Sequence, residues 1–573
     1  MSNIINVARG FEKADLVIKN ANIVNVLSEE IHKADIAIKD GIIAGIGENY
    51  SGEKEIDIQG AYVTPSFIDG HVHLESTMML PSEFAKVALP AGTTTVIIDP
   101  HEISNVLGLH GISFMHEAVK NLPLDVYTML PSCVPATPFE TSGFDLNSYD
   151  LSLLIDKPWV LGLAEMMNFP GVLNQDNNVM AKLELAKSRG KCIDGHAPYL
   201  HGKDLCAYIA SGVKSDHECT TPDEAVEKLR LGMYVMVREG TAAKDLDALM
   251  PVLKTCNTRK CIFVTDDRHP ADLKEHINGM VRRAVEAGVD PVKAIQIASL
   301  NTAEYFGLKN LGAIAPGYKA DLLILPDLKT FKPDLVIKNG VVAAENGKLI
   351  AELPENEALA VRNSVNVRWI TPEDFRIEAN GSKVTALEVI PLQLITKSVV
   401  SEVKIEDGNA VSNIDNDTLK ICVIERHRAT GNIGKGFVKG FNLKCGAIAS
   451  TVAHDSHNMI VIGTNDADMY AAAVALIKCK GGKVVVKDGE VISELPLPIA
   501  GLMSDRNFDY VVNKCEELNK TAHSIGCRIE DPFMTMGFLS LPVIPELKVT
   551  DKGVFDTNKF DFIDIFEKAV VMK

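Results

Sequence analysis

Residues 65–73 read PSFIDGHVH, a short apolar run that ends in two histidines separated by one residue. An apolar run of this length is typical of a strand buried in a parallel sheet. Side chains one residue apart on a strand share a face, so His71 and His73 can bind the same cation. The end of this strand is therefore a candidate metal site, and the surrounding sequence decides which fold holds it.

Seven further strand-like runs follow, at intervals that leave room for helices. Helical character is clear in stretches such as NVMAKLELAKSRG (178–190) and DEAVEKLRLG (223–232), each of which ends in glycine. A (β/α)₈ barrel takes roughly 250 residues. We therefore predict an α/β fold with a TIM-like (β/α)₈ barrel over residues 63–306. The seven runs are 94–99, 124–130, 159–164, 191–194, 213–216, 233–237 and 261–265.

Residues of metal-ligand type recur where these strands end. In a barrel of this kind the active-site groups project from the carboxyl ends of the strands, so side chains far apart in sequence converge. A single histidine at a strand end is more often a hydrogen-bonding residue than a ligand. The joint pattern instead predicts a metal centre, and its nitrogen and oxygen ligands suit zinc, iron and manganese alike. The six candidate ligands are His71, His73, Glu165, His196, His217 and Asp266.

The segments on either side of the barrel predict two further domains. The phrase DLVIKN occurs at 15–20 and again at 334–339, in both cases among strand-like residues. We expect one small β-sandwich domain, built from residues 1–62 and 307–362, in which the two copies pair. Residues 363–573 mix strand and helix signals and predict an additional C-terminal α+β domain. It carries His454 and His457, for which a loop role and a contact with the metal site both stay open.

Composition excludes several classes of function. The 573 residues are 46% apolar and carry a formal charge of −18, which disfavours binding to nucleic acid or to an anionic membrane surface. The 11 cysteines form no C-x-x-C pair, which favours a reducing compartment. The chain has neither a signal-peptide pattern nor an apolar run long enough to span a bilayer. We expect a cytoplasmic enzyme that binds a small molecule, and we predict a homo-oligomer.

Several motifs carry a resemblance to a known family. Paired histidines after strand one, single histidines after strands five and six, and an aspartate after strand eight resemble the amidohydrolase superfamily. Residues 301–325 look like that superfamily's usual exit from the barrel. Within it, the chain is similar to the bacterial adenine deaminases nearly end to end. The similar stretches are GHVHLESTMMLP (70–81), TTVIIDPHEISNV (94–106), LGLAEMMNFPG (161–171), VREGTAA (237–243), TDDRHP (265–270) and AHDSHN (453–458).

The resemblance implies a binuclear centre and a reaction. His71 and His73 would hold one divalent ion, His196 and His217 the second, and Glu165 would bridge them. Asp266 would touch the first ion and act as the proton shuttle. The family implies manganese or iron, so we expect two Mn²⁺ ions, with Fe²⁺ or Zn²⁺ as alternatives. The implied reaction is hydrolytic deamination of adenine to hypoxanthine and ammonia, in purine salvage or adenine catabolism.

Four further residues have both a functional and a structural interpretation. His101 could be a catalytic group that reaches substrate or water, or it could cap a helix and support the site from behind the ligands. Glu75 could hydrogen-bond a purine nitrogen or orient His73. Arg238 and Glu239 could line the substrate pocket or pair as ions at the end of strand seven.

Two alternatives to an adenine deaminase stay open. One is another cyclic amidohydrolase of the same fold that acts on a different ring or on an N-acyl substrate. The other is a non-catalytic scaffold, against which the complete ligand set counts.

Either Asp266 or Asp267 could be the ligand after strand eight, because only one of two successive residues can face the metal site. The resemblance favours Asp266.

Overall fold

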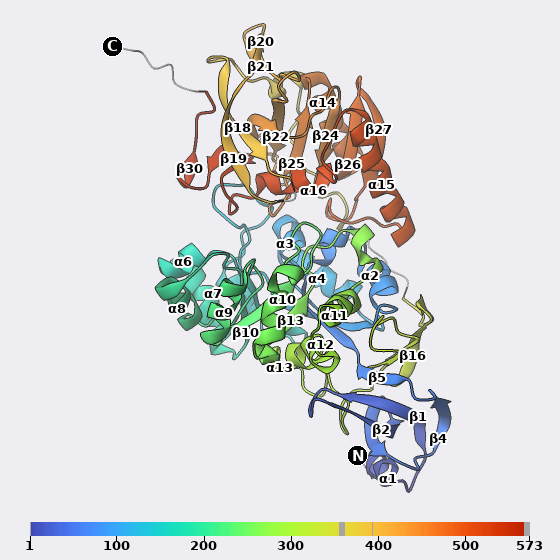
Figure 1. Cartoon of the computed structure of the whole chain (residues 1–573). Helices are drawn as coiled ribbons and strands as arrows, with labels where there is room; N and C mark the ends of the chain where they lie inside the picture. The colour runs from blue at the N-terminus through green and yellow to red at the C-terminus, as the bar shows by residue number, and fades with distance from the viewer. Residues whose placement is uncertain (1, 355–360, 392, 567–573) are drawn as a thin grey trace.

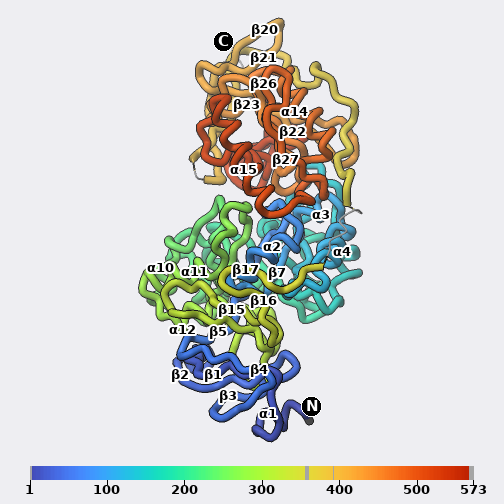
Figure 2. Tube along the Cα trace, turned by 90° about the vertical axis from the view of Figure 1, so that its right-hand side faces the viewer, coloured from blue at the N-terminus to red at the C-terminus, as the bar shows by residue number. Residues whose placement is uncertain are grey.

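The structure is a computed structural model that describes every residue except 1, 355–360, 392 and 567–573. Residue 1 of the first expected segment, residues 355–360 of the 307–362 segment, and residues 392 and 567–573 of the last domain therefore lie outside the described part. Figures 1 and 2 show three bodies in a row. Strands from both flanks form one end, an α/β body forms the middle, and the C-terminal segment forms the other end.

The middle body is a curled parallel sheet. Each of the eight predicted runs overlaps one strand, and the α/β class is confirmed. The strands hydrogen-bond as an arc of five (β10-β9-β8-β7-β6) and an arc of three (β11-β12-β13). They are β6 (Phe67–Val72), β7 (Thr93–Ile98), β8 (Asp125–Leu130), β9 (Val160–Met166), β10 (Cys192–Gly195), β11 (Ser215–Asp216), β12 (Tyr234–Arg238) and β13 (Cys261–Val264).

Single backbone contacts join the two arcs where a continuous barrel would carry a full ladder. The amide of Lys214, just before β11, donates to the carbonyl of Ile193 in β10 at 3.0 Å. At the other seam the amide of Asp266 donates to the carbonyl of His71 at 2.9 Å, beside a parallel bridge between Val72 and Asp266. The second seam therefore brings Asp266 directly to the paired histidines.

Helices surround the curled sheet (Figure 1). Strands β6 and β7 are buried along their whole length, which explains why their sequences are continuous apolar runs rather than alternating ones. Inside the sheet, Ile68, Met129 and Ile262 belong to one buried cluster. The helices are α2 (Pro81–Ala88), α3 (His101–Leu107), α4 (Leu109–Ala118), α5 (Ser148–Ser152), α6 (Phe169–Leu173), α7 (Asn177–Ser188), α8 (Gly202–Ala210), α9 (Pro222–Arg230), α10 (Leu246–Thr255), α11 (Ile277–Glu286), α12 (Pro291–Ile297) and α13 (Leu300–Tyr305).

The two flanks contribute to one nine-stranded sheet. The two DLVIKN copies lie in β1 and β15, but β5 and β14 separate them, so the expected pairing of the copies is wrong. Strand β5 crosses the expected boundary at residue 62 and leads into β6. The sheet contains β1 (Ala14–Asn25), β2 (Glu30–Lys39), β3 (Ile42–Gly47), β4 (Gly52–Asp57), β5 (Tyr62–Pro65), β14 (Leu322–Leu325), β15 (Leu335–Lys338), β16 (Val341–Glu345) and β17 (Lys348–Leu349), preceded by α1 (Ser2–Ala8).

The C-terminal body is a mixed α and β structure around an eight-stranded sheet in the order β19-β18-β23-β22-β25-β24-β26-β27. Its main strands are β18 (Lys383–Val389), β19 (Thr396–Glu402), β22 (Leu419–Ile424), β23 (Ile433–Lys439), β24 (Ala447–Ser450), β25 (Met459–Gly463), β26 (Gly482–Lys487) and β27 (Glu490–Pro496). Smaller strands are β20 (Lys404–Glu406), β21 (Asn409–Val411), β28 (Leu547–Thr550), β29 (Gly553–Asp556) and β30 (Asp561–Phe562). The helices are α14 (Asp466–Lys478), α15 (Phe508–Ser524) and α16 (Pro532–Gly537).

One apolar core runs from the middle body into the C-terminal body. It joins Phe84 and Val96, from α2 and β7, to Ile421, Ile460 and Leu502 of the C-terminal body. The two bodies are therefore packed together and not merely tethered. Within the described residues, no helix has the length and apolar character needed to cross a bilayer.

We predict that Phe67→Ala destabilises the protein strongly. Phe67 has no exposed surface and packs in the cluster that joins β6 to the flank sheet. Removing a buried phenyl ring typically costs about 3–5 kcal/mol. The measurement is the midpoint of denaturant unfolding. Phe11→Ala is the matched control, because Phe11 is 66% exposed. Equal midpoints for the two variants would contradict the packing described.

Candidate metal centre

The six candidate ligands meet at one point, at the carboxyl ends of the strands. His71 belongs to β6 and His73 follows it, while Glu165 lies in β9. His196, His217 and Asp266 are the first or second residues after β10, β11 and β13. All are buried except His196, whose side chain is 20% exposed.

The carboxylate of Glu165 lies between two pairs of imidazoles. Its Oε1 is 3.3 Å from Nε2 of His73 and 3.7 Å from Nε2 of His71. Its Oε2 is 2.8 Å from Nδ1 of His196 and 3.2 Å from Nε2 of His217. Each oxygen of one carboxylate therefore faces a different pair of ring nitrogens.

Asp266 completes the first group. Its Oδ1 is 3.1 Å from Nε2 of His73 and 3.5 Å from Nε2 of His71, and its Oδ2 is 3.1 Å from Nη1 of Arg238. The backbone of Asp266 has a φ of 59°, a left-handed conformation that is uncommon for a residue other than glycine. The bond from its amide to the carbonyl of His71 supports that conformation. Asp267 is turned elsewhere and accepts a hydrogen bond from the hydroxyl of Ser76.

The hydrogen bonds of His73 decide which ring nitrogen faces the carboxylates. Its Nδ1 lies 2.9 Å from the backbone oxygen of Asp99, which can only accept, so Nδ1 carries a proton. Whenever the ring is neutral, the lone pair of Nε2 therefore points toward Asp266 and Glu165. Nε2 of His71 is buried and has no hydrogen-bond partner among the described residues. Acceptors that face one another in this way need a proton or a cation between them.

The charges of the cluster also show that its carboxylates need positive charge beside them. Burial raises the pKa of Glu165. The charge of His217 and the hydrogen bonds from the imidazoles outweigh this effect and hold that pKa well below its usual range. Burial also opposes the ionised form of Asp266, but the adjacent imidazoles of His71 and His73 and the charge of Arg238 hold its pKa well below normal. Conversely, burial would lower the pKa of His217, yet Glu165 raises it to about 9. Buried carboxylates here stay ionised only beside positive charge, which bound metal ions also supply.

The donor set therefore fits metal ions. Donors that share an ion at ~2.1 Å lie roughly 3–3.5 Å from one another, close to the separations here. His71, His73 and Asp266 form one such group, and His71, Glu165 and His217 form another. A third contains His196, His217 and Glu218. Glu218 is not among the ligands predicted from the sequence, although it directly follows His217 at a strand end.

A buried ion pair supports the segments that carry His196 and His217. The ammonium of Lys228 in α9 lies 2.9 Å from Oδ2 of Asp216 and 2.7 Å from Oε1 of Glu224, and it donates to the carbonyl of Ala197 at 3.0 Å. Asp216 also accepts from the amide of Ala197 at 2.7 Å. The residues next to both histidines are thus fixed by one lysine.

His101 lies at the edge of the centre. Its Nδ1 is 3.1 Å from Oδ2 of Asp99 and 3.6 Å from Oε1 of Glu165. It is the first residue of α3, and the residue before it, Pro100, makes no side-chain cap. The catalytic and the structural interpretations of His101 both stay predictions.

The structure separates the other candidates. Arg238 contacts Asp266 directly and also pairs with Glu218, whereas Glu239 forms its ion pair with Arg283 of α11. Glu75 accepts from the amide of Ile103 at 3.2 Å, and its buried Oε2 has no hydrogen-bond partner among the described residues. Burial and the charge of Glu102 raise the pKa of Glu75 to about 7.

His454 and His457 do not sit in an isolated loop. Nδ1 of His454 is 2.9 Å from Oε1 of Glu102, the neighbour of His101. Nε2 of His457 is 3.8 Å from Oε2 of the same carboxylate.

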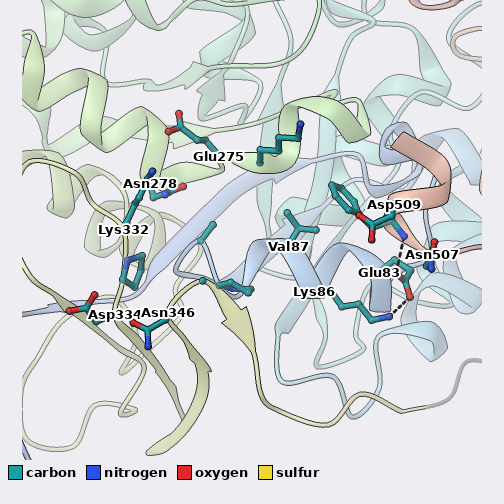
Figure 3. A pocket seen from close by; sticks show the side chains of 16 residues that line it. Glu83, Lys86, Val87, Glu275, Asn278, Lys332, Asp334, Asn346, Asn507 and Asp509 are labelled. Carbon is teal, nitrogen blue, oxygen red and sulfur yellow. Dashed lines mark hydrogen bonds and ion pairs between the residues drawn. The ribbon is translucent and has the colours of Figure 1, made fainter. Parts of the chain in front are cut away.

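A separate open pocket is lined by Lys86, Asn278 and Asn507, among other residues. None of the six candidate ligands lines it (Figure 3).

Comparisons with known proteins cover nearly the whole chain. The model of the amidohydrolase family matches residues 62–350, and that of the adenine deaminase C-terminal domain matches residues 393–561. The model of the urease alpha-subunit N-terminal domain matches residues 3–66.

Individual relatives agree with the family models. The chain is 50% identical over 569 residues to adenine deaminase 2 of Carboxydothermus hydrogenoformans, covering 99% of each chain. It is 49% identical to adenine deaminase of Desulfatibacillum aliphaticivorans, over 98% of this chain and 99% of that one. A crystal structure of an adenine deaminase matches 58% of this chain and 100% of its own, with 20% identity and a TM-score of 0.44.

We predict that Lys228→Met destabilises the protein by about 3–5 kcal/mol, because it leaves the buried carboxylates of Asp216 and Glu224 without a cation. The measurement is the shift of the denaturant unfolding midpoint. The control is Arg282→Met, which breaks a partly exposed pair with Glu286 and should cost less than about 1 kcal/mol. Similar shifts for both variants would show that the buried pair has no special role.

Proposed function

The chain belongs to the adenine deaminase family of the amidohydrolases, and from that premise we propose that it hydrolyses adenine to hypoxanthine and ammonia at a binuclear metal centre. The observation that carries the proposal is the Glu165 carboxylate, whose two oxygens face two separate pairs of histidines. One carboxylate in that position can bridge two ions. We assign the catalytic part to residues 63–306, with the C-terminal body packed against it.

The proposed ligand roles follow the two groups. His71, His73 and Asp266 would hold the first ion, and His196 and His217 the second. Two divalent ions, when bound, lower the pKa of water enough to supply hydroxide near neutral pH and polarise the substrate. We propose manganese, with iron or zinc as alternatives, because imidazole and carboxylate ligands suit all three.

We place the reaction in the cytoplasm, where all 11 cysteines, none of them in a disulfide, would stay reduced. The homo-oligomer stays a prediction.

The remaining steps belong to the protein's own side chains. C6 of adenine gains an oxygen from water and loses its amino group, so one proton must move from the attacking water to the departing nitrogen. Asp266 is the proposed shuttle, because Arg238 holds its Oδ2 while Oδ1 faces the centre. His101 lies close enough to Glu165 to contact the departing amino group. Glu75, whose Oε2 has no hydrogen-bond partner in the described part of the chain, is the proposed contact to a purine ring nitrogen.

We predict that Glu165→Gln loses metal and activity together. A neutral amide bridges two cations poorly, so at least one ion per chain should be lost. Loss of a group that merely supports a ligand costs 10- to 100-fold, so kcat/KM should fall by more than about 100-fold here. Elemental analysis and the ultraviolet change on adenine loss measure both effects. Glu184→Gln, at an exposed position in α7, is the control. Two ions and a near-normal rate in Glu165→Gln would refute the bridging role.

We also predict a large difference between Asp266→Asn and Asp267→Asn. Asp266 faces His71 and His73, whereas Asp267 bonds to Ser76. Loss of a proton shuttle costs roughly 10²–10⁴-fold, so Asp266→Asn should remove nearly all activity. Asp267→Asn should be milder, and added metal should restore part of its rate. Measured kcat/KM and metal content for both variants decide the matter, and a reversed order would reassign the shuttle.

A further inference from the structure

The C-terminal body reaches the centre through residues 453–458, which connect β24 to β25. We call this the 453–458 segment. Its sequence is AHDSHN, and each of the six residues is no more than 3% exposed. Two charged residues of the first turn of α3, His101 and Glu102, lie directly against it. The segment therefore meets the edge of the metal centre although it is more than 180 residues away in sequence from Asp266.

His454, His457 and Glu102 could themselves suggest a further metal site. The hydrogen bonds of His457 argue against it. Its Nδ1 accepts from the amide of Ala453 at 3.2 Å, so in the neutral ring the proton is on Nε2, which faces Glu102. A protonated nitrogen has no lone pair for a metal. The cluster instead gives Glu102 one imidazole donor, Nδ1 of His454 at 2.9 Å, and this contact fixes the 453–458 segment to α3.

Asp455 is the residue that this attachment brings toward the centre. Its Oδ1 lies 3.8 Å from Nε2 of His101, and Nδ1 of the same ring lies 3.6 Å from Oε1 of Glu165. Asp455 is therefore one imidazole ring away from the proposed bridging ligand. Its Oδ2 is buried and has no hydrogen-bond partner among the described residues. A buried carboxylate oxygen without a partner is costly, so a donor is expected to bind there in the working enzyme.

Among the described residues, no hydrogen bond joins Oδ2 of Asp455 to its neighbour Glu140. Glu140 is 4% exposed, and its Oε2 also lacks a hydrogen-bond partner among the described residues. Burial and then the charge of Asp455 raise the pKa of Glu140 to about 8. Glu140 is thus mainly protonated at neutral pH. Its carboxyl group also forms a hydrogen bond with the side chain of Ser456. Oδ2 of Asp455 is therefore left to a donor from outside the described residues.

We propose that Asp455 is a specificity-determining residue whose Oδ2 accepts a hydrogen bond from the N–H of the five-membered ring of the purine base. The inference rests on the proposed function. The exocyclic amino group of adenine must lie at the metal centre, where it is lost. The other N–H of the free base is on the five-membered ring, and a carboxylate is an acceptor only. A purine substituted at N9 lacks this donor and would leave Asp455 buried and unpaired.

This role explains why a free base would be preferred over a nucleoside. A site built to hydrogen-bond a substrate N–H rejects an analogue without it far more strongly than a merely apolar pocket would. The C-terminal body would thus read the end of the purine farthest from the reacting carbon. The six candidate ligands, all in the middle body, would perform the chemistry.

The test compares adenine with 9-methyladenine in the metal-loaded full chain. The wild type should strongly prefer adenine. In Asp455→Ala, kcat/KM for adenine should fall by roughly 10- to 100-fold, whereas that for 9-methyladenine should stay level or rise. The preference should therefore collapse, with the loss for adenine mainly in KM. Asp455→Asn, which keeps an acceptor oxygen without the charge, should lie between the two and serves as the measured variant if Asp455→Ala does not fold.

Asp551→Asn is the matched control. Asp551 is also buried in the C-terminal body and crosses the same boundary, accepting from the amide of Thr141 at 2.8 Å and from Asn432 at 3.1 Å. It contacts none of the proposed ligands in these bonds, so the ratio between the two substrates should not change. Thermal midpoint and metal content are measured for every variant.

Three results would overturn the inference. Equal losses for both substrates in Asp455→Ala would give Asp455 a merely structural role. An unchanged preference would show that it does not touch the purine. A loss of one bound cation per chain in Asp455→Ala, with the other ions retained, would make the Asp455 oxygen a cation ligand. Failure of the metal-loaded wild type to consume adenine would instead refute the proposed function itself.

Discussion

The arrangement of the centre depends on one buried carboxylate that serves two sets of imidazoles. Glu165 can face His71 and His73 with one oxygen, and His196 and His217 with the other, only if four strand ends stay within a few ångströms of one another. Buried strands packed on both faces provide that rigidity, whereas free loops would not. The cost of burying these charges explains the rest of the site, since Arg238 and the imidazoles supply the compensating positive charge.

The strands of the curled sheet could be predicted because a strand covered on both faces must be apolar throughout. The same pattern says nothing about which strands are neighbours. The two DLVIKN copies both form strands of one sheet, yet β5 and β14 lie between them. The seams of the curled sheet could not be predicted from the sequence either. Strand β11 is only two residues long, and a single bridge at Asp266, just after β13, joins that edge to β6. Apolar periodicity reports burial, and partner choice is decided by contacts distant in sequence.

The six candidate ligands could be found from the sequence because the chain repeats one strand and one helix, and each repeat ends at the same edge. Residues outside that repeat left no such signal. Asp455 approaches His101 from a different body. The neighbouring His454 and His457 marked this stretch as a candidate contact, but nothing in the sequence indicated that Asp455 faces His101. Likewise, the pairing of Glu239 with Arg283 rather than with the centre depends on where α11 packs. A strand-end position predicts that a side chain is near the site, but the helix opposite decides what it contacts.

Hydrogen bonds and apolar packing together hold the 453–458 segment in place. Arg426 is fully buried and donates to the carbonyls of His457 and Ala500, which ties the segment to the body of its sheet. That sheet shares an apolar core with α2 and β7 of the middle body. Because the core is continuous, moving Asp455 away from His101 would require opening buried apolar surface, which costs roughly 25 cal/mol for each Å² exposed to water. The C-terminal body is therefore held to the centre by the same hydrophobic burial that holds the strands together.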